Sequence, residues 1–137
     1  MLAPYGHCTQ KICEQFFPRF GIGKDRAKGV ATAFGCGMGH GETCGCVTGV
    51  LLVLGLYCTH KYPGESERMH NALQDAVREF EAAFLQKHPG LRCETILGRD
   101  LSQPGAMEDA KRSGIFETVC LPMIQATCAW LEKRVQD

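Results

Sequence analysis

The chain has 137 residues, nine of them cysteine, and its 15 basic and 15 acidic side chains give a formal net charge of zero. Balanced, interspersed charge argues against nucleic acid or an anionic membrane surface as the main partner. The length predicts a single domain over residues 1–137, large enough to bury a core without covalent staples. Because the cysteine count is high and odd, it indicates metal or redox chemistry rather than a disulfide framework.

Hydrophobic periodicity predicts an all-α fold with about five main helices, and no stretch shows the alternation of a strand. The helix from Cys44 to about Thr59 is apolar on nearly every face, so we expect it to be the buried centre, with Thr43 as its N-cap. Gly49 and Gly55 inside it are predicted to be places where a neighbouring helix packs closely. The other expected segments are helices over 8–17, 24–34, 66–87 and 116–136, a short apolar piece over 91–97, and an excursion over 98–114 with a helical turn near 107–112.

The N-terminus has no basic segment followed by an apolar one, so no signal peptide is expected. The most apolar run, Val47 to Tyr57, has 11 residues, about half of the ~20 that a membrane span needs. We therefore expect a soluble, cytoplasmic protein. Its partner is predicted to be an unknown electron-transfer protein, and the apolar central helix leaves a homodimer open.

A loop rich in glycine and cysteine precedes the central helix. Glycine at every second position from Gly35 to Gly41 rules out an ordinary helix, because glycine loses the most backbone entropy on ordering. The loop presents Cys44 near the positive end of a helix dipole, which favours the thiolate. It lacks the Lys-Ser or Lys-Thr pair of a P-loop and follows a helix, so nucleotide binding has no support.

Four cysteines share one feature, because each lies at or near the beginning of a predicted helix or short apolar segment: Cys8, Cys44, Cys93 and Cys120. We predict that these helix ends meet at one point and form a site. Three others are predicted to pack as small hydrophobic residues: Cys13, Cys58 and Cys128. Cys36 and Cys46 stay open between a ligand, a reactive thiol and packing, and a helix would turn Cys46 about 200° away from Cys44.

Histidines and familiar cysteine spacings add little to this site. His40, in the glycine loop, is open between a ligand, an acid–base group and a solvent-facing side chain. His7 carries the same alternatives, whereas His60, His70 and His88 are expected to be ordinary. Because no Cys-x-x-Cys pair occurs, a zinc ribbon, a thioredoxin motif and covalent haem have no support.

Residues 35–56 read G-x-G-M-G-x-G-E-T-C-G-x-V-T-G-x-L-x-x-L-G-L. This segment resembles the signature of the family named "C_GCAxxG_C_C putative redox-active protein". The resemblance extends over nearly the whole chain, through the early Cys8, the Arg-Cys-x-x-Ile-Leu-Gly piece at Cys93 and the Val-Cys pair at Cys120. It implies a mostly helical bacterial or archaeal protein with a redox role. The family is similar to the non-haem part of split-Soret cytochromes c, in which four cysteines are thought to hold an iron–sulfur cluster. It usually has glycine at position 36 and alanine at position 46, where this chain has cysteine.

Three functions follow as hypotheses, and they leave open whether the protein is an oxidoreductase or an electron carrier. The leading one is an iron–sulfur cluster for electron transfer, with Cys8, Cys44, Cys93 and Cys120 as metal ligands. Backbone N–H groups of the loop glycines would then contact the cofactor, at Gly37, Gly39, Gly41 and Gly45. The alternative is a metal-free thiol–disulfide oxidoreductase or thiol sensor, in which Cys44 attacks and Cys36, Cys46 or Cys120 resolves. The third is a structural zinc module.

Overall fold

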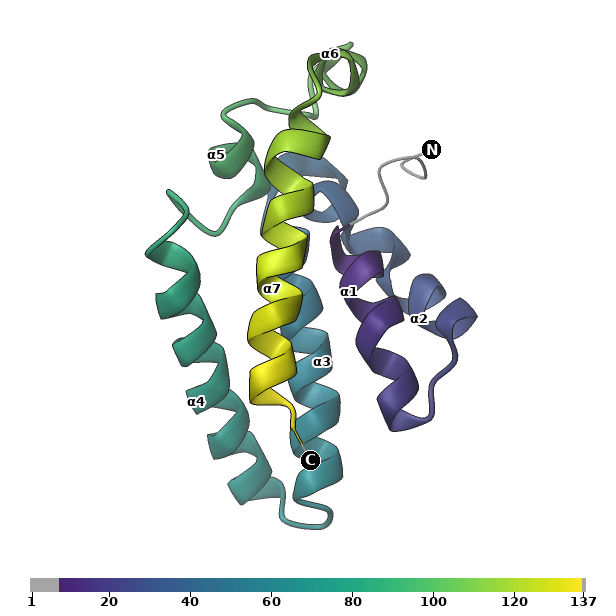
Figure 1. Cartoon of the computed structure of the whole chain (residues 1–137), viewed down its shortest axis with the longest axis vertical. Coiled ribbons are helices and arrows are strands. Elements are labelled where there is room, and N and C mark those ends of the chain that lie inside the picture. Colours follow the sequence, from purple (N-terminus) through teal and green to yellow (C-terminus); the bar gives the residue numbers. More distant parts are fainter. Residues whose placement is uncertain (1–7, 137) are drawn as a thin grey trace.

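The computed structural model describes residues 8–136, and within this range it contains seven α-helices and no strand. Helix α3 (Gly45–Lys61) lies at the centre, as predicted, with ten buried residues along its length. The other helices surround it in the arrangement of Figure 1. They are α1 (Cys8–Phe16), α2 (Lys24–Ala31), α4 (Ser66–Leu85), α5 (Cys93–Leu97), α6 (Ala106–Ser113) and α7 (Leu121–Arg134). Short turns link them: η2 (Phe17–Phe20), η3 (Thr32–Phe34), η4 (Gly37–Gly41) and η5 (Phe116–Cys120).

Helix α1 packs against the first half of α3 through small and polar residues. A Cβ atom added at Gly49 would lie 3.1 Å from the Ile12 side chain, so the glycine permits the close approach that the sequence predicted. The buried Thr9 hydroxyl donates a hydrogen bond to the Gly45 carbonyl at 3.1 Å and shares another with the Thr48 hydroxyl at 3.0 Å. These bonds fix the rotation of α1 on α3, because buried hydroxyls without partners would cost free energy.

Helices α4 and α7 cover the other side of α3. The apolar side of α4 is buried through Ala76, Phe80 and Phe84. The Phe80 ring meets the Trp130 ring of α7 edge-on, with 5.1 Å between the centroids. Pro122 lies in the first turn of α7, a position that needs no backbone N–H donor.

Two details of the central helix differ from the sequence predictions. Its N-cap is Cys44 rather than Thr43, and the Cys44 sulfur accepts a hydrogen bond from the Cys46 N–H at 3.4 Å. Gly55 is not a point of close helix packing, because a Cβ atom placed there would have no neighbour within 4 Å. Thr43 forms an isolated antiparallel bridge with Arg92 instead of capping the helix.

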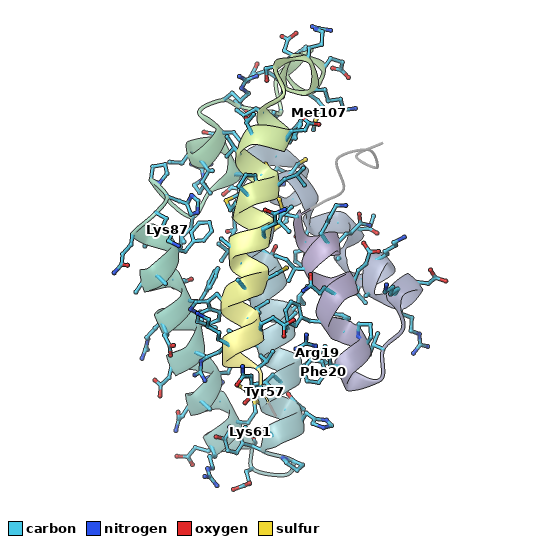
Figure 2. The ribbon with its side chains drawn as sticks, viewed as in Figure 1. Arg19, Phe20, Tyr57, Lys61, Lys87 and Met107 are labelled. Atoms are coloured by element: carbon cyan, nitrogen blue, oxygen red, sulfur yellow. The ribbon has the colours of Figure 1, made fainter. Side chains whose placement is uncertain are left out.

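Three of the helices run in one direction. Helices α1, α3 and α7 run the same way, so that their N-terminal ends lie together near α5 and α6, at the top of Figure 1. Figure 2 shows Met107 at this end and Tyr57 and Lys61 at the opposite end of α3. In the part of the chain that the structure describes, no single helix is long and apolar enough to cross a membrane; α6 and residues 116–134 pass that test only as a pair bent by 66°.

Candidate functional site

Five cysteines line one small cavity at the end of the molecule where three helices begin: Cys8, Cys36, Cys44, Cys93 and Cys120. The cavity holds about 20 Å³ of free space, room for about one water molecule. Its remaining walls are almost entirely apolar and consist of Gly45, Ile96, Leu97, Phe116 and Met123. The structure therefore brings together the four cysteines that begin predicted segments, and adds Cys36 to them.

The common direction of three helices explains how distant cysteines meet. Cys8 is the first residue of α1, Cys44 is the N-cap of α3, and Cys120 directly precedes α7. The N-terminal ends of these helices lie together in Figure 1. The N-terminal end of α3 carries partial positive charge and free N–H groups, which stabilise negative charge on the Cys44 sulfur. Cys120 lies instead where η5 continues into α7, because the Leu121 N–H donates to the Phe116 carbonyl.

A two-residue backbone bridge brings the fourth cysteine into place. The Cys44 N–H donates to the Leu91 carbonyl at 2.7 Å, and the Cys93 N–H donates to the Glu42 carbonyl at 2.6 Å. Arg92 adds an ion pair to Glu42 at 3.2 Å, in which both side chains are about half exposed. Exposed pairs of this kind contribute about 0–1 kcal/mol, so the backbone bonds position Cys93 beside Cys44.

The glycine loop forms an irregular turn with a left-handed backbone at several positions. Gly37 has φ +62°, and a Cβ atom there would lie 2.4 Å from the Glu42 nitrogen. Gly41 has φ +75° and packs against Glu94, whereas Gly39 is exposed and has no such neighbour. Cys36 also has positive φ, 53°, although it is not glycine. The path of the loop thus requires Gly37 and Gly41, and their role toward a cofactor stays a prediction.

Gly45 serves a different purpose from the loop glycines. A Cβ atom there would lie 2.8 Å from the Cys8 Cβ and 2.9 Å from the Thr9 backbone nitrogen. Only a residue without a side chain allows the start of α1 to lie against the start of α3. Gly45 therefore sets the approach of Cys8 to Cys44.

Cys46 contacts the site, contrary to the helical-wheel prediction. Its backbone N–H donates to the Cys44 sulfur at 3.4 Å. The Cys44 thiol raises the pKa of Cys46 well above its usual range, and Cys8 and Thr127 act in the opposite direction. The prediction was wrong because Cys44 is extended, with ψ 140°, so the 200° rotation of two helical residues does not apply. Cys46 is fully buried and lies outside the cavity lining.

Hydrogen bonding among the thiols lowers the pKa of some cysteines and raises the pKa of others. The thiol of Cys46, the thiol of Cys8 and the backbone N–H groups of α3 hold the pKa of Cys44 well below its usual range. A hydrogen bond from Cys8 likewise lowers the pKa of Cys120. Donating these bonds raises the pKa of Cys8 well above its usual range, chiefly through its bond to Cys120. Cys44 and Cys120 are thus the two positions that favour a thiolate, and for Cys44 the direction agrees with the sequence prediction.

Cys93 and Cys36 lie in a different environment on the loop side of the cavity. Burial raises the pKa of Cys93, and the charges of Cys44, Cys36 and Cys120 add to the effect. Burial also raises the pKa of Cys36, to about 11, with opposing contributions from Cys120 and Lys111. Cys36 is half-buried, whereas Cys93 is 8% exposed.

The remaining sequence candidates lie away from the cavity. Cys13, Cys58 and Cys128 are buried in the hydrophobic core, which confirms the packing prediction. His40 is exposed in the glycine loop, and His7 lies outside the described residues. The other three histidines make ordinary contacts: His60 with Phe20, His70 with Gln74 and His88 with Phe84.

The donor set suits an iron–sulfur cluster in kind and number. Such clusters are held by four cysteine thiolates, and five thiols surround this apolar cavity. Among residues 8–136, no three His, Cys, Asp or Glu side chains are arranged to hold a single metal ion. Since the cavity has room for about one water molecule, the sulfurs must move apart to admit any cluster.

Comparison with known proteins identifies the family. The sequence model of the C_GCAxxG_C_C family, described as "putative redox-active protein", matches residues 6–134. The chain belongs to this family. The five cysteines that line the cavity, and Cys46 beside them, lie within the matched range. No curated protein and no solved structure matches the chain.

Proposed function

We propose that the protein carries electrons through an iron–sulfur cluster held by Cys8, Cys44, Cys93 and Cys120. The observation that carries this proposal is the meeting of these four cysteines, from four separate segments, around one apolar cavity. Packing alone does not require thiols at the starts of α1, α3, α5 and α7. The redox description of the family supports the same class of function.

Each part of the site has a role in this proposal. Cys44 and Cys120, whose pKa values are lowered, would supply thiolates most readily. A bound cluster supplies one-electron transfer, and its potential depends on hydrogen bonds to the sulfurs and on exposure to solvent. The Cys46 N–H already donates to the Cys44 sulfur at 3.4 Å. The apolar walls, such as Leu97 and Phe116, would keep water from the sulfurs.

The experiment is anaerobic reconstitution of the full chain with ferrous iron and sulfide, followed by iron and acid-labile sulfide analysis after desalting. We expect iron and sulfide in equal amounts and a brown protein whose colour bleaches on reduction. Cys44→Ala should abolish uptake, whereas Cys58→Ala, a buried cysteine outside the cavity, should retain it. A colourless wild type without iron, or one with stoichiometric redox-silent zinc, contradicts the proposal.

A further inference from the structure

The cavity holds one more thiol than a cluster requires, and the extra one is Cys36. Clusters need four cysteine ligands, but Cys36 lines the same cavity as the four predicted ones. It is not a lone cysteine on a surface, because it lines one cavity with Cys93 and Cys120 and lies near enough for their charges to interact. Its side chain is half-buried.

The backbone of Cys36 keeps a conformation that suits glycine. Its φ of 53° and ψ of 40° are left-handed, a region that residues with a Cβ atom rarely adopt. Cys36 therefore places a thiol in the cavity while the loop follows the same path that a glycine would allow. Replacing it by glycine should leave that path intact, so Cys36→Gly removes the thiol without changing the backbone.

The sulfurs around the cavity fall into two groups. The thiol of Cys8 lowers the pKa of both Cys44 and Cys120, so these three cysteines form one group on the cavity wall. Cys36 and Cys93 line the same cavity, and they lie close enough for the charge of one to act on the other. Cys46 also acts on Cys8 and Cys44, but it lies outside the lining. Among the five lining thiols, Cys36 and Cys93 are therefore available for the fourth place.

We propose that Cys36 is an alternative fourth ligand, able to replace Cys93 in holding the iron–sulfur cluster. This inference rests on the proposed function and adds to it a residue outside the four-cysteine set. Cys8, Cys44 and Cys120 supply the other three ligands. Either Cys36 or Cys93 completes the set.

Four variants of the full chain, reconstituted anaerobically with ferrous iron and sulfide, test the proposal: Cys36→Gly, Cys93→Ala, the double variant and Cys44→Ala. Alanine is used at ligand positions because a serine oxygen can replace a thiolate. Both single variants should retain the wild-type iron and sulfide content, whereas the double variant should fall to the level of Cys44→Ala. Cys93→Ala should also show a changed electron paramagnetic resonance spectrum, since its fourth ligand differs. Far-UV circular dichroism of each variant checks its folding.

A second measurement uses wild-type protein alone, so it does not depend on how a variant folds. Combined cleavage after Lys28 and Glu42 isolates a fragment in which Cys36 is the only cysteine. Iodoacetamide labelling of that fragment should be slower in iron-loaded protein than in metal-free protein, while the labelling of Cys128 changes little. If the wild-type protein takes up no iron, the proposed function itself is contradicted. If wild type binds iron, the inference is overturned when folded Cys93→Ala loses it as fully as Cys44→Ala, when the double variant keeps it, or when Cys36 labels equally fast in both forms.

Discussion

The contact between α1 and α3 at Gly45 should be the most sensitive packing point of the site. A methyl group added there would lie 2.8 Å from the Cys8 Cβ, 2.8 Å from the Thr9 hydroxyl oxygen and 2.9 Å from the Thr9 backbone nitrogen. A backbone atom cannot rotate away, so Gly45→Ala must push α1 from α3. Overpacking of this kind typically costs about 1–3 kcal/mol, and a gain in helix propensity below about 1 kcal/mol only partly offsets it.

Two other glycines of the same helix serve as matched controls. At Gly49 the nearest atoms are side-chain atoms of Ile12 at 3.1–3.2 Å, a milder overlap than at Gly45, so Gly49→Ala should lower the free energy of unfolding by less than Gly45→Ala does. At Gly55 nothing lies within 4 Å, so Gly55→Ala should stabilise the fold by about 1 kcal/mol through helix propensity. The predicted order of stability is therefore Gly55→Ala, then Gly49→Ala, then Gly45→Ala.

Urea unfolding followed by far-UV circular dichroism measures this order, with a thiol reductant and a chelator present so that neither disulfides nor metals contribute. We expect Gly45→Ala and Gly55→Ala to differ by about 1–4 kcal/mol in the free energy of unfolding. If Gly45→Ala is as stable as Gly55→Ala, the close approach of Cys8 to α3 is not what holds the two helices together, and the account of the site's assembly fails.

Three further predictions concern the loop, the core and the surface. Cys36→Gly should raise the free energy of unfolding by about 1 kcal/mol, because a left-handed backbone costs a residue with a Cβ atom about that much; urea unfolding that shows no gain would argue against the φ of 53°. Burial raises the pKa of Cys13 from about 9 to about 12. Between these pH values the unfolded chain loses a proton that the folded chain keeps, so the free energy of unfolding falls as pH rises. Urea unfolding at a series of pH values should show a shallower fall for Cys13→Val, and an equal fall in wild type and variant would refute the assignment. Arg92→Gln should cost less than about 1 kcal/mol, because its pairs with Glu42 and Glu94 are about half exposed; a loss above about 2 kcal/mol in thermal unfolding would show that the ion pairs, rather than the backbone, hold Cys93 in place.

The sequence predicts the elements whose signals are local. The apolar spacing over 66–87 locates α4 to within two residues, and the uniformly apolar run after Cys44 identifies the buried α3. The excursion over 98–114 contains α6, about where one turn of helix was expected. The sequence also singles out four cysteines by their positions near segment starts, and these four line one cavity. They meet because helices that run in one direction bring their N-terminal ends together.

Features that depend on distant partners were not predicted. Thr43 has the composition of an N-cap, but its pairing with Arg92, far along the chain, takes it out of that role. The position of Cys46 was missed because a helical wheel assumes that Cys44 is helical, and the extended backbone at Cys44 brings the two sulfurs together. A glycine in a helix, such as Gly55, can face either a closely packed helix or open space, and the sequence alone does not distinguish the two.

The central claim is that the cysteines at the starts of α1, α3, α5 and α7 hold iron. X-ray diffraction from anaerobically grown crystals of the reconstituted protein, recorded above and below the iron absorption edge, locates iron atoms directly. Our account predicts anomalous density among the sulfurs of Cys8, Cys44 and Cys120, with Cys93 or Cys36 as the fourth neighbour. Iron found elsewhere on the molecule, or these sulfurs still in contact around a cavity without iron, would contradict it.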